Sequence, residues 1–186
     1  MGGMTRVHID CETFSRADLP RTGAHQYARD PSTECLMVAY ARDDCLGFGP
    51  VQLWDCTTAP MPDDLHHLLH SDAVTLCAFN AGFEQAVFEH CLGMPFDPSR
   101  WLCVQALALS FGFPGSLAGV GDALSLKGDK AKSAEGAKLI RKFSIPQPKT
   151  GHRILPAADP KAWAAFCEYC RQDVVAEYEI YRRLSQ

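Results

Sequence analysis

The chain has 186 residues, of which 47% are hydrophobic and 22% charged, and its formal net charge is −4. This composition is typical of an ordinary globular protein, long enough to bury a core within one domain over residues 1–186. It has no apolar run long enough to cross a membrane and no charged-then-apolar leader, so we expect a cytoplasmic protein without membrane contacts.

The strands come mainly in the first half of the chain. Residues 6–10 alternate between apolar and polar, which places Val7 and Ile9 on one face of a strand and His8 and Asp10 on the other. Residues 36–40 and 51–54 read as two strands of a hairpin across a turn-rich connection. A short helix over 62–70 is then followed by a buried strand over 73–79.

From Asn80 onward the apolar residues follow the helical period. We predict a first helix after Asn80 that ends before Gly93. Further helices are predicted over 101–111, 117–126, 134–143 and 160–184, with Ser116 capping the helix over 117–126 and a loop over 144–160. Strands followed by strand–helix alternation indicate an α/β protein, with one sheet flanked by helices.

Nine cysteines are present, without the spacing of a disulfide framework. We therefore expect reduced thiols. Cys167 and Cys170 have a spacing found in zinc sites, but two further ligands of matching spacing are missing from the sequence. A zinc or thiol protein is accordingly a weak rival interpretation.

Basic residues gather in one segment. Residues 127–153 carry eight bases and two acids, while the remainder carries ten bases and twenty acids. A basic segment on an acidic body predicts a local contact with phosphate groups. The alternative is a solvated surface helix followed by a loop.

Three distant segments supply acids that could meet in one pocket. Asp10 and Glu12 share one face of a strand, Glu84 begins a helix just after a strand, and Tyr169 and Asp173 stand one helical turn apart. Each segment alone could be a surface feature. Together, four carboxylates would repel each other unless divalent metal ions bound between them, and two such ions are the usual apparatus of phosphodiester hydrolysis.

These segments resemble the motifs of a known family. Ile-Asp10-Cys-Glu12-Thr, Asn80-Ala-Gly-Phe-Glu84 and Tyr169-Cys-Arg-Gln-Asp173 are similar to the three motifs of the DEDD, or DnaQ-like, 3′–5′ exonucleases, in the subgroup with a tyrosine in the third motif. The resemblance covers residues 5–183 and is closest to the proofreading domains of phage-type family A DNA polymerases. It implies a ribonuclease H-like fold with a mixed β-sheet flanked by helices. Glu84 departs from the aspartate found in most relatives.

The resemblance also implies roles for the motif residues. Asp10 would bridge two Mg²⁺ or Mn²⁺ ions, Glu12 and Asp173 would hold the ion that prepares the attacking water, and Glu84 would support the other ion. Tyr169 would aim the water at the terminal phosphate, which suits a neutral phenol.

The implied reaction is removal of nucleoside 5′-monophosphates from the 3′ end of single-stranded DNA by a monomer, either free-standing or joined to a polymerase module in a bacterial or phage-infected cell. Candidates for contacts with backbone phosphates are Lys138, Arg141 and Lys142, and the loop that carries Lys149, His152 and Arg153 is a second option. Phe14 would stack on a terminal base or lie in the core. Further candidate substrate contacts beside the motifs are Thr13, Asn80 and Phe83. The alternatives are an exoribonuclease or oligonucleotide-degrading enzyme, and a non-catalytic module that binds 3′ ends for a polymerase.

Overall fold

The computed structural model describes residues 5–95, 97–126 and 130–186, without the side chains of residues 130–133. The strands are β1 (Thr5–Phe14), β2 (Glu34–Asp44), β3 (Gly47–Phe48), β4 (Gln52–Asp55), β5 (Val74–Ala78) and β6 (Trp101–Cys103). The α-helices are α1 (Leu19–Arg29), α2 (Asp63–His70), α3 (Ala81–Leu92), α4 (Val104–Ser110), α5 (Leu117–Ala123), α6 (Lys130–Phe143) and α7 (Pro160–Leu184). Two short 3₁₀ turns cover Pro98–Arg100 and Pro156–Ala158.

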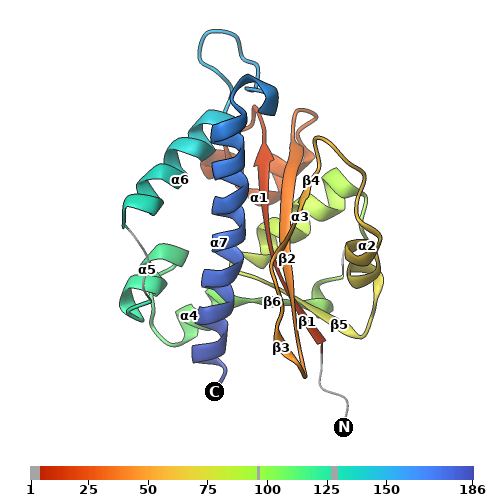
Figure 1. The fold of residues 1–186 in the computed structure, drawn as a ribbon, viewed down its shortest axis with the longest axis vertical. Coiled ribbons are helices and arrows are strands. Elements are labelled where there is room, and N and C mark those ends of the chain that lie inside the picture. The colour runs from red at the N-terminus through yellow and green to blue at the C-terminus, as the bar shows by residue number, and fades with distance from the viewer. Residues whose placement is uncertain (1–4, 96, 127–129) are drawn as a thin grey trace.

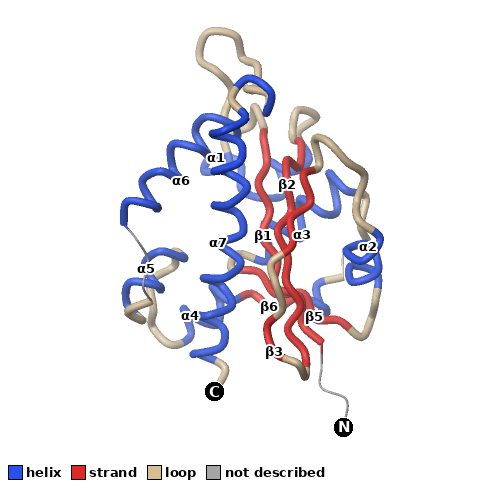
Figure 2. The backbone as a smooth tube through the Cα atoms, in the orientation of Figure 1, coloured by secondary structure: helices blue, strands red, loops and turns tan. Residues whose placement is uncertain are grey.

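One mixed sheet organises the molecule, with its long strands β1 and β2 side by side (Figure 2). β1 pairs antiparallel with β2 and parallel with β5, and β5 pairs parallel with β6. β3 and β4 pair with successive parts of the other edge of β2. Because β1 and β5 are parallel, their carboxyl ends lie at the same end of the sheet, where ligands commonly bind in α/β proteins.

The alternation predicted for the first strand is confirmed. Val7, Ile9 and Cys11 are buried in the core between the sheet and helices α1, α2 and α3. His8 and Asp10 point to the other face, where α7 lies. The strand is therefore buried on both faces, and its polar residues face the longest helix.

Helices cover both faces of the sheet (Figure 1). α1, α2 and α3 lie on one side, and α7 crosses the other side with α4, α5 and α6 beside it. The core under α6 and α7 contains Met37, Ala39, Phe143 and Phe166. The mixed sheet with helices on both faces is the arrangement that the sequence predicts.

One local prediction was wrong, and one helix was missed. The first part of the helix predicted over 101–111 is strand β6, which pairs with β5, and the helix starts only at Val104. A short apolar run has no period that separates a buried strand from a helix. Helix α1 was not predicted, because Pro20 and Gly23 suggest loop and Gly23 interrupts the helix with φ 74°.

Two other local predictions, the hairpin and the helix cap, are confirmed. The hairpin of β2 and β4 forms, with Val38 opposite Trp54. Ser116 caps α5 by accepting a hydrogen bond from the Gly119 amide. All nine cysteines are free thiols. Within the described residues, no helix combines the length and apolar character that crossing a membrane requires.

Candidate active site

Three carboxylates from the first and last elements of the fold meet in one cluster. Asp10 and Glu12 project from β1, and Asp173 projects from the middle of α7. One carboxylate oxygen from each lies within 4.8 Å of the others. The strand period and the helix position that predicted a shared pocket thus bring together residues more than 160 positions apart.

Glu84 reaches the same region from the other side of the sheet. β5 runs parallel to β1 with Cys77 opposite His8, so the start of α3, just after β5, arrives beside Asp10. The Glu84 side chain is 4% exposed, and its Oε2 atom has no hydrogen-bond partner. A buried carboxylate oxygen without a partner is costly unless a cation compensates it.

The electrostatics of the four acids favour a bound cation. Burial, and then the charge of Asp173, raises the pKa of Asp10 well above its usual value. Burial, and then the charge of Asp10, raises the pKa values of Glu12 and Glu84 in the same direction. Burial raises the pKa of Asp173 to about 6, although a hydrogen bond with Tyr169 opposes the change.

Such shifts mean that the acids resist ionising together. Oxygen ligands at this spacing match the donors that Mg²⁺ and Mn²⁺ prefer. The residues therefore fit a divalent cation held by Asp10, Glu12 and Asp173, with Glu84 close by.

Tyr169 and Cys170 border the cluster from α7. Burial, followed by the charge of Asp173, raises the pKa of the Tyr169 phenol, which therefore stays protonated at neutral pH. The Cys170 thiol lies 3.4 Å from Oδ2 of Asp10 and donates a hydrogen bond to it. In the sequence, Cys170 stands out as a residue of the last helix's buried stripe and as half of a weak zinc-like pair. Its position between Tyr169 and Asp173 on the same helix was the signal for the contact with Asp10.

A buried polar pair under the cluster was missed in the sequence. Nδ1 of His8 lies 2.6 Å from Oε2 of Glu177, and both side chains are almost fully buried. His8 is two residues before Asp10 on β1, and Glu177 is one helical turn after Asp173 on α7. The spacing in the sequence could have revealed this pair. His8 continues the strand period that places Asp10 on the inner face of β1, and Glu177 continues the helix period that places Asp173 on the inner face of α7.

The other candidate substrate contacts lie in different surroundings. Phe14 is 4% exposed and packs in the core with Leu36 and Phe143, so it offers no free ring face to a base in this structure. The Thr13 hydroxyl lies 2.8 Å from the hydroxyl of Tyr27. The Phe83 ring is 5.9 Å from the Tyr27 ring.

Asn80, the remaining candidate beside the motifs, is exposed at the start of α3. Its side chain makes no capping hydrogen bond to the helix. It stays a prediction that the substrate contacts Thr13, Phe14, Asn80 and Phe83.

The candidate phosphate-binding residues lie on α6. Lys138 and Arg141 are exposed, whereas the ammonium group of Lys142 pairs with Asp159, the N-cap residue of α7. Lys127, the first base of the segment, lies outside the described residues. Lys138 and Arg141 are therefore better placed than Lys142 to meet a phosphate.

The double substitution Lys138→Ala/Arg141→Ala is expected to weaken binding of single-stranded DNA and to make it less sensitive to salt. The slope of log K against log salt concentration should fall by about 1.4, since each phosphate contact of a single strand contributes roughly 0.7. Fluorescence anisotropy in an Asp10→Asn background measures binding without cleavage. Arg182→Ala, at the far end of α7, is the control, and equal slopes for all three proteins would refute the assignment.

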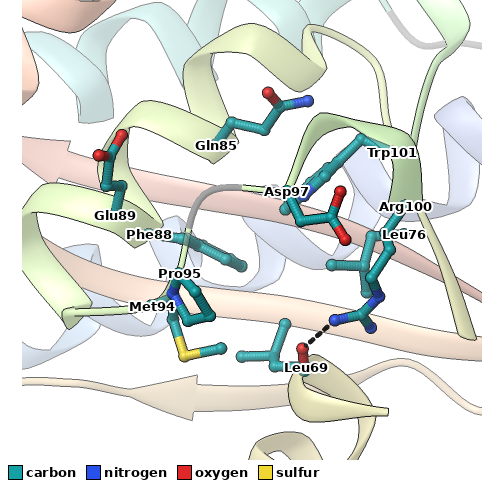
Figure 3. A pocket seen from close by; sticks show the side chains of 10 residues that line it. All are labelled: Leu69, Leu76, Gln85, Phe88, Glu89, Met94, Pro95, Asp97, Arg100 and Trp101. Carbon is teal, nitrogen blue, oxygen red and sulfur yellow. Dashed lines mark hydrogen bonds between the residues drawn. The ribbon is translucent and has the colours of Figure 1, made fainter. Parts of the chain in front are cut away.

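A separate pocket lies on the face of the sheet that α2 and α3 cover, opposite α7 (Figure 3). Its lining includes Phe88, Arg100 and Trp101, and Arg100 donates a hydrogen bond of 2.6 Å to the carbonyl of Leu69. The cavity of about 20 Å³ holds little more than one water molecule. It is too small for a nucleotide and contains none of the acids of the cluster.

A second trio of possible metal ligands, His25, Glu89 and His90, lies on α1 and α3. It shares no residue with the acid cluster. Measurements of metal binding to the acid cluster therefore need an Asp10 variant as reference.

Comparison with known proteins gives a sequence relative and solved structures of the same fold. No protein-family model matches it. The DNA polymerase of Bacillus phage SP02 is 38% identical over 189 residues, an alignment that covers 98% of this chain and 28% of the polymerase. The chain thus spans little more than a quarter of the length of that curated relative.

Solved structures share the fold. Brucella melitensis NrnC with bound Mg²⁺ superposes with a TM-score of 0.56 at 17% identity, over 97% of this chain and 72% of NrnC. Escherichia coli RNase D, an exoribonuclease involved in structured RNA processing, gives 0.55 at 17% identity, over 97% of this chain and 38% of RNase D.

At 17% identity the likeness to NrnC and RNase D shows the fold alone. The sequence relationship is the match to the phage polymerase. The chain has the ribonuclease H-like fold that it shares with NrnC and RNase D, and its sequence is similar to about a quarter of a phage DNA polymerase.

Proposed function

We propose that the protein is a metal-dependent 3′–5′ exonuclease that removes nucleoside 5′-monophosphates from single-stranded DNA. The observation that carries the proposal is the cluster of Asp10, Glu12 and Asp173, whose oxygens approach within 4.8 Å. Buried acids with raised pKa values repel a polyanion when they ionise, unless cations lie between them. A metal-binding pocket therefore accounts for the acids and for a phosphodiester substrate together.

Two divalent ions, Mg²⁺ or Mn²⁺, suit the four acids. Asp10 is central to the pocket, because the charges of Asp173 and Glu177 act on it and its own charge acts on Glu12 and Glu84. Asp10 would contribute to both sites, Glu12 and Asp173 to one, and Glu84 to the other. Bound there, such ions lower the pKa of water and neutralise the phosphate and the leaving 3′-oxygen.

The protein's own side chains supply orientation. The Tyr169 phenol, protonated and hydrogen-bonded with Asp173, would direct a water molecule toward the terminal phosphate. The Cys170 thiol donates to Asp10 and limits the rotation of that carboxylate. Lys138 and Arg141 would hold the phosphates of the strand behind the cleaved bond.

The polymer is proposed from the relative with the stronger sequence match. The phage SP02 relative is a DNA polymerase, which favours DNA, a polymerase module as a partner, and action in the cytoplasm of a bacterial or phage-infected cell. An exonuclease of this kind would proofread for a polymerase or would work as a free-standing enzyme. RNase D is an exoribonuclease with the same fold, which keeps trimming of RNA as the second candidate.

A 5′-labelled DNA strand and an RNA strand of the same sequence test the proposal. With Mg²⁺ or Mn²⁺ we expect a ladder of DNA fragments shortened from the 3′ end, and with EDTA no cleavage. A 3′-labelled DNA strand is the control for polarity, since its label should be released as mononucleotide in the first turnover.

The outcomes separate the candidate functions. Faster shortening of RNA than of DNA would favour the ribonuclease, because contacts to the 2′-hydroxyl distinguish the two polymers. Metal-independent binding of 3′ ends without any cleavage would favour a non-catalytic binding module over an enzyme.

A further inference from the structure

One face of α6 packs against α7 and has a glycine in it. Gly136, Leu139, Ile140 and Phe143 follow the helical spacing i, i+3, i+4, i+7. Gly136, Leu139 and Phe143 are buried, and the three apolar side chains pack into the core cluster that Tyr169 joins. Figure 1 shows α6 beside the half of α7 that is nearer its N-terminus.

The glycine lies directly against the ring of Tyr169. A Cβ atom added to Gly136 would be 2.8 Å from Cζ of Tyr169, 2.5 Å from its Cδ2 and closer still to its Cε2. Cβ atoms do not approach other heavy atoms within 3.0 Å in real structures. No residue with a side chain fits at position 136 while the tyrosine ring stays where it is.

Helix formation does not explain this glycine. Glycine is the poorest helix former after proline, because it loses the most backbone entropy. Gly121 in α5 provides a comparison, since a Cβ atom there would meet nothing within 4 Å. At Gly136 the close approach of two helices supplies the physical reason.

We propose that Gly136 is a positioning residue for Tyr169: α6 packs against the tyrosine ring where no side chain intervenes, and thereby fixes the direction of the hydroxyl. The proposal rests on the proposed function, in which that hydroxyl aims the attacking water.

The surroundings of the ring support this role. The Tyr169 ring is stacked on Phe166 with 6.5 Å between centroids and 19° between planes. Phe166 is stacked in turn on Phe143 of α6, at 5.6 Å and 16°. Tyr169 therefore contacts α6 directly at Gly136 and indirectly through Phe166. Its hydroxyl, at the end of this arrangement, is hydrogen-bonded with Asp173 in the acid cluster.

Gly136→Ala is expected to displace the ring, since the ring is the nearest group that can move. A shift of about 1 Å in a catalytic group can lower a rate roughly 100-fold, so kcat should fall by roughly 10- to 100-fold. KM should change by less than about threefold, because Lys138 and Arg141 remain exposed on the same helix. Gly121→Ala is the matched control and should leave both constants unchanged.

Combined substitutions identify the ring as the group that Gly136 accommodates. Gly136→Ala is combined with Tyr169→Ala, which removes the ring, and with Tyr169→Phe, which keeps the ring without its hydroxyl. Beside Tyr169→Ala, the new methyl group meets no ring, so Gly136→Ala should raise the melting temperature as in any helix and cause no further loss of kcat. Beside Tyr169→Phe, the clash persists and the melting temperature should not rise.

The proposal and the proposed function fail in different ways. If the wild type is an active exonuclease and Gly136→Ala leaves kcat unchanged, only the role of Gly136 is overturned. Equal changes in melting temperature in the Tyr169→Ala and Tyr169→Phe backgrounds would overturn it as well. A wild type without nuclease activity on DNA and RNA overturns the proposed function and the role of Gly136 with it.

Discussion

Asp10→Asn is expected to abolish metal-dependent cleavage, with a fall in kcat/KM of roughly 1,000-fold or more. Asp10 is the acid whose charge acts on both Glu12 and Glu84, so its loss affects the binding of every cation in the pocket. Stabilisation of transition-state charge by metals amounts to several kcal/mol, and each 1.4 kcal/mol or so corresponds to a factor of about ten in rate. Single-turnover cleavage of 5′-labelled DNA in Mg²⁺ measures the loss.

The same substitution is expected to stabilise the metal-free protein. Burial and the charge of Asp173 raise the pKa of Asp10, so the folded state binds more protons than the unfolded state. For an acid with a raised folded pKa, stability falls as pH rises through that pKa. In EDTA the wild type should therefore melt at a lower temperature at pH 8 than at pH 5, a window that includes the pKa of about 6 to which burial raises Asp173. Asp10→Asn should melt higher than the wild type at pH 8 and depend less on pH.

Opposite effects on activity and stability distinguish a ligand from a structural residue. Asp72→Asn, at an exposed position after α2, is the matched control and should change neither property. Mg²⁺ should raise the melting temperature of the wild type and of the control, but not that of Asp10→Asn. Loss of activity together with loss of stability in EDTA would instead mean that Asp10 supports the fold, and the assignment as a ligand would be wrong.

Local periods in the sequence were sufficient to predict much of the site. The strand period places His8, Asp10 and Glu12 on one face of β1, and the helix period places Tyr169 and Asp173 on one face of α7. These rules depend only on backbone geometry, so they hold before any packing is known. The parallel pairing of β5 with β1, which brings Glu84 beside Asp10, follows from the α/β alternation.

The features that were missed depend on contacts between distant segments. Trp101–Cys103 forms a strand because β5 offers it an edge, although its own sequence continues smoothly into α4. Gly136 has no local reason to be a glycine, and the nearby ring of Tyr169 provides one. Lys142 looks like its neighbours Lys138 and Arg141 in sequence, but it faces Asp159 at the start of α7. Such pairings follow from how the helices pack, which no short sequence window contains.

The buried pair of His8 and Glu177 is expected to contribute strongly to stability. His8→Phe leaves the Glu177 carboxylate buried without its partner, which should cost about 3–5 kcal/mol, the usual cost of breaking a buried pair. For a chain of this length, that corresponds to a melting temperature lower by roughly 10 °C or more. Burial already raises the pKa of Glu177, and His8 opposes the change. The loss should therefore be largest at pH 8 and should become smaller as the pH falls toward the raised pKa of this carboxyl.

A second substitution that makes both positions apolar should recover most of the lost stability. The His8 ring lies 5.1 Å from the Tyr178 ring and 6.0 Å from the Phe48 ring, so a phenylalanine there meets aromatic neighbours. His8→Phe combined with Glu177→Leu replaces the pair by apolar groups, a change that is often neutral in buried sites. Urea unfolding of the wild type, both single variants and the double variant measures the coupling between the two positions.

The exposed pair of Arg182 and Glu179 on α7 provides the control cycle, and its coupling should be too small to move the unfolding midpoint. Additive losses at positions 8 and 177 would show that the two side chains act independently. If they are coupled as expected, the pair ties β1 to α7 directly below the cluster. The spacing between Asp10 and Asp173 then depends on a contact that never touches the substrate.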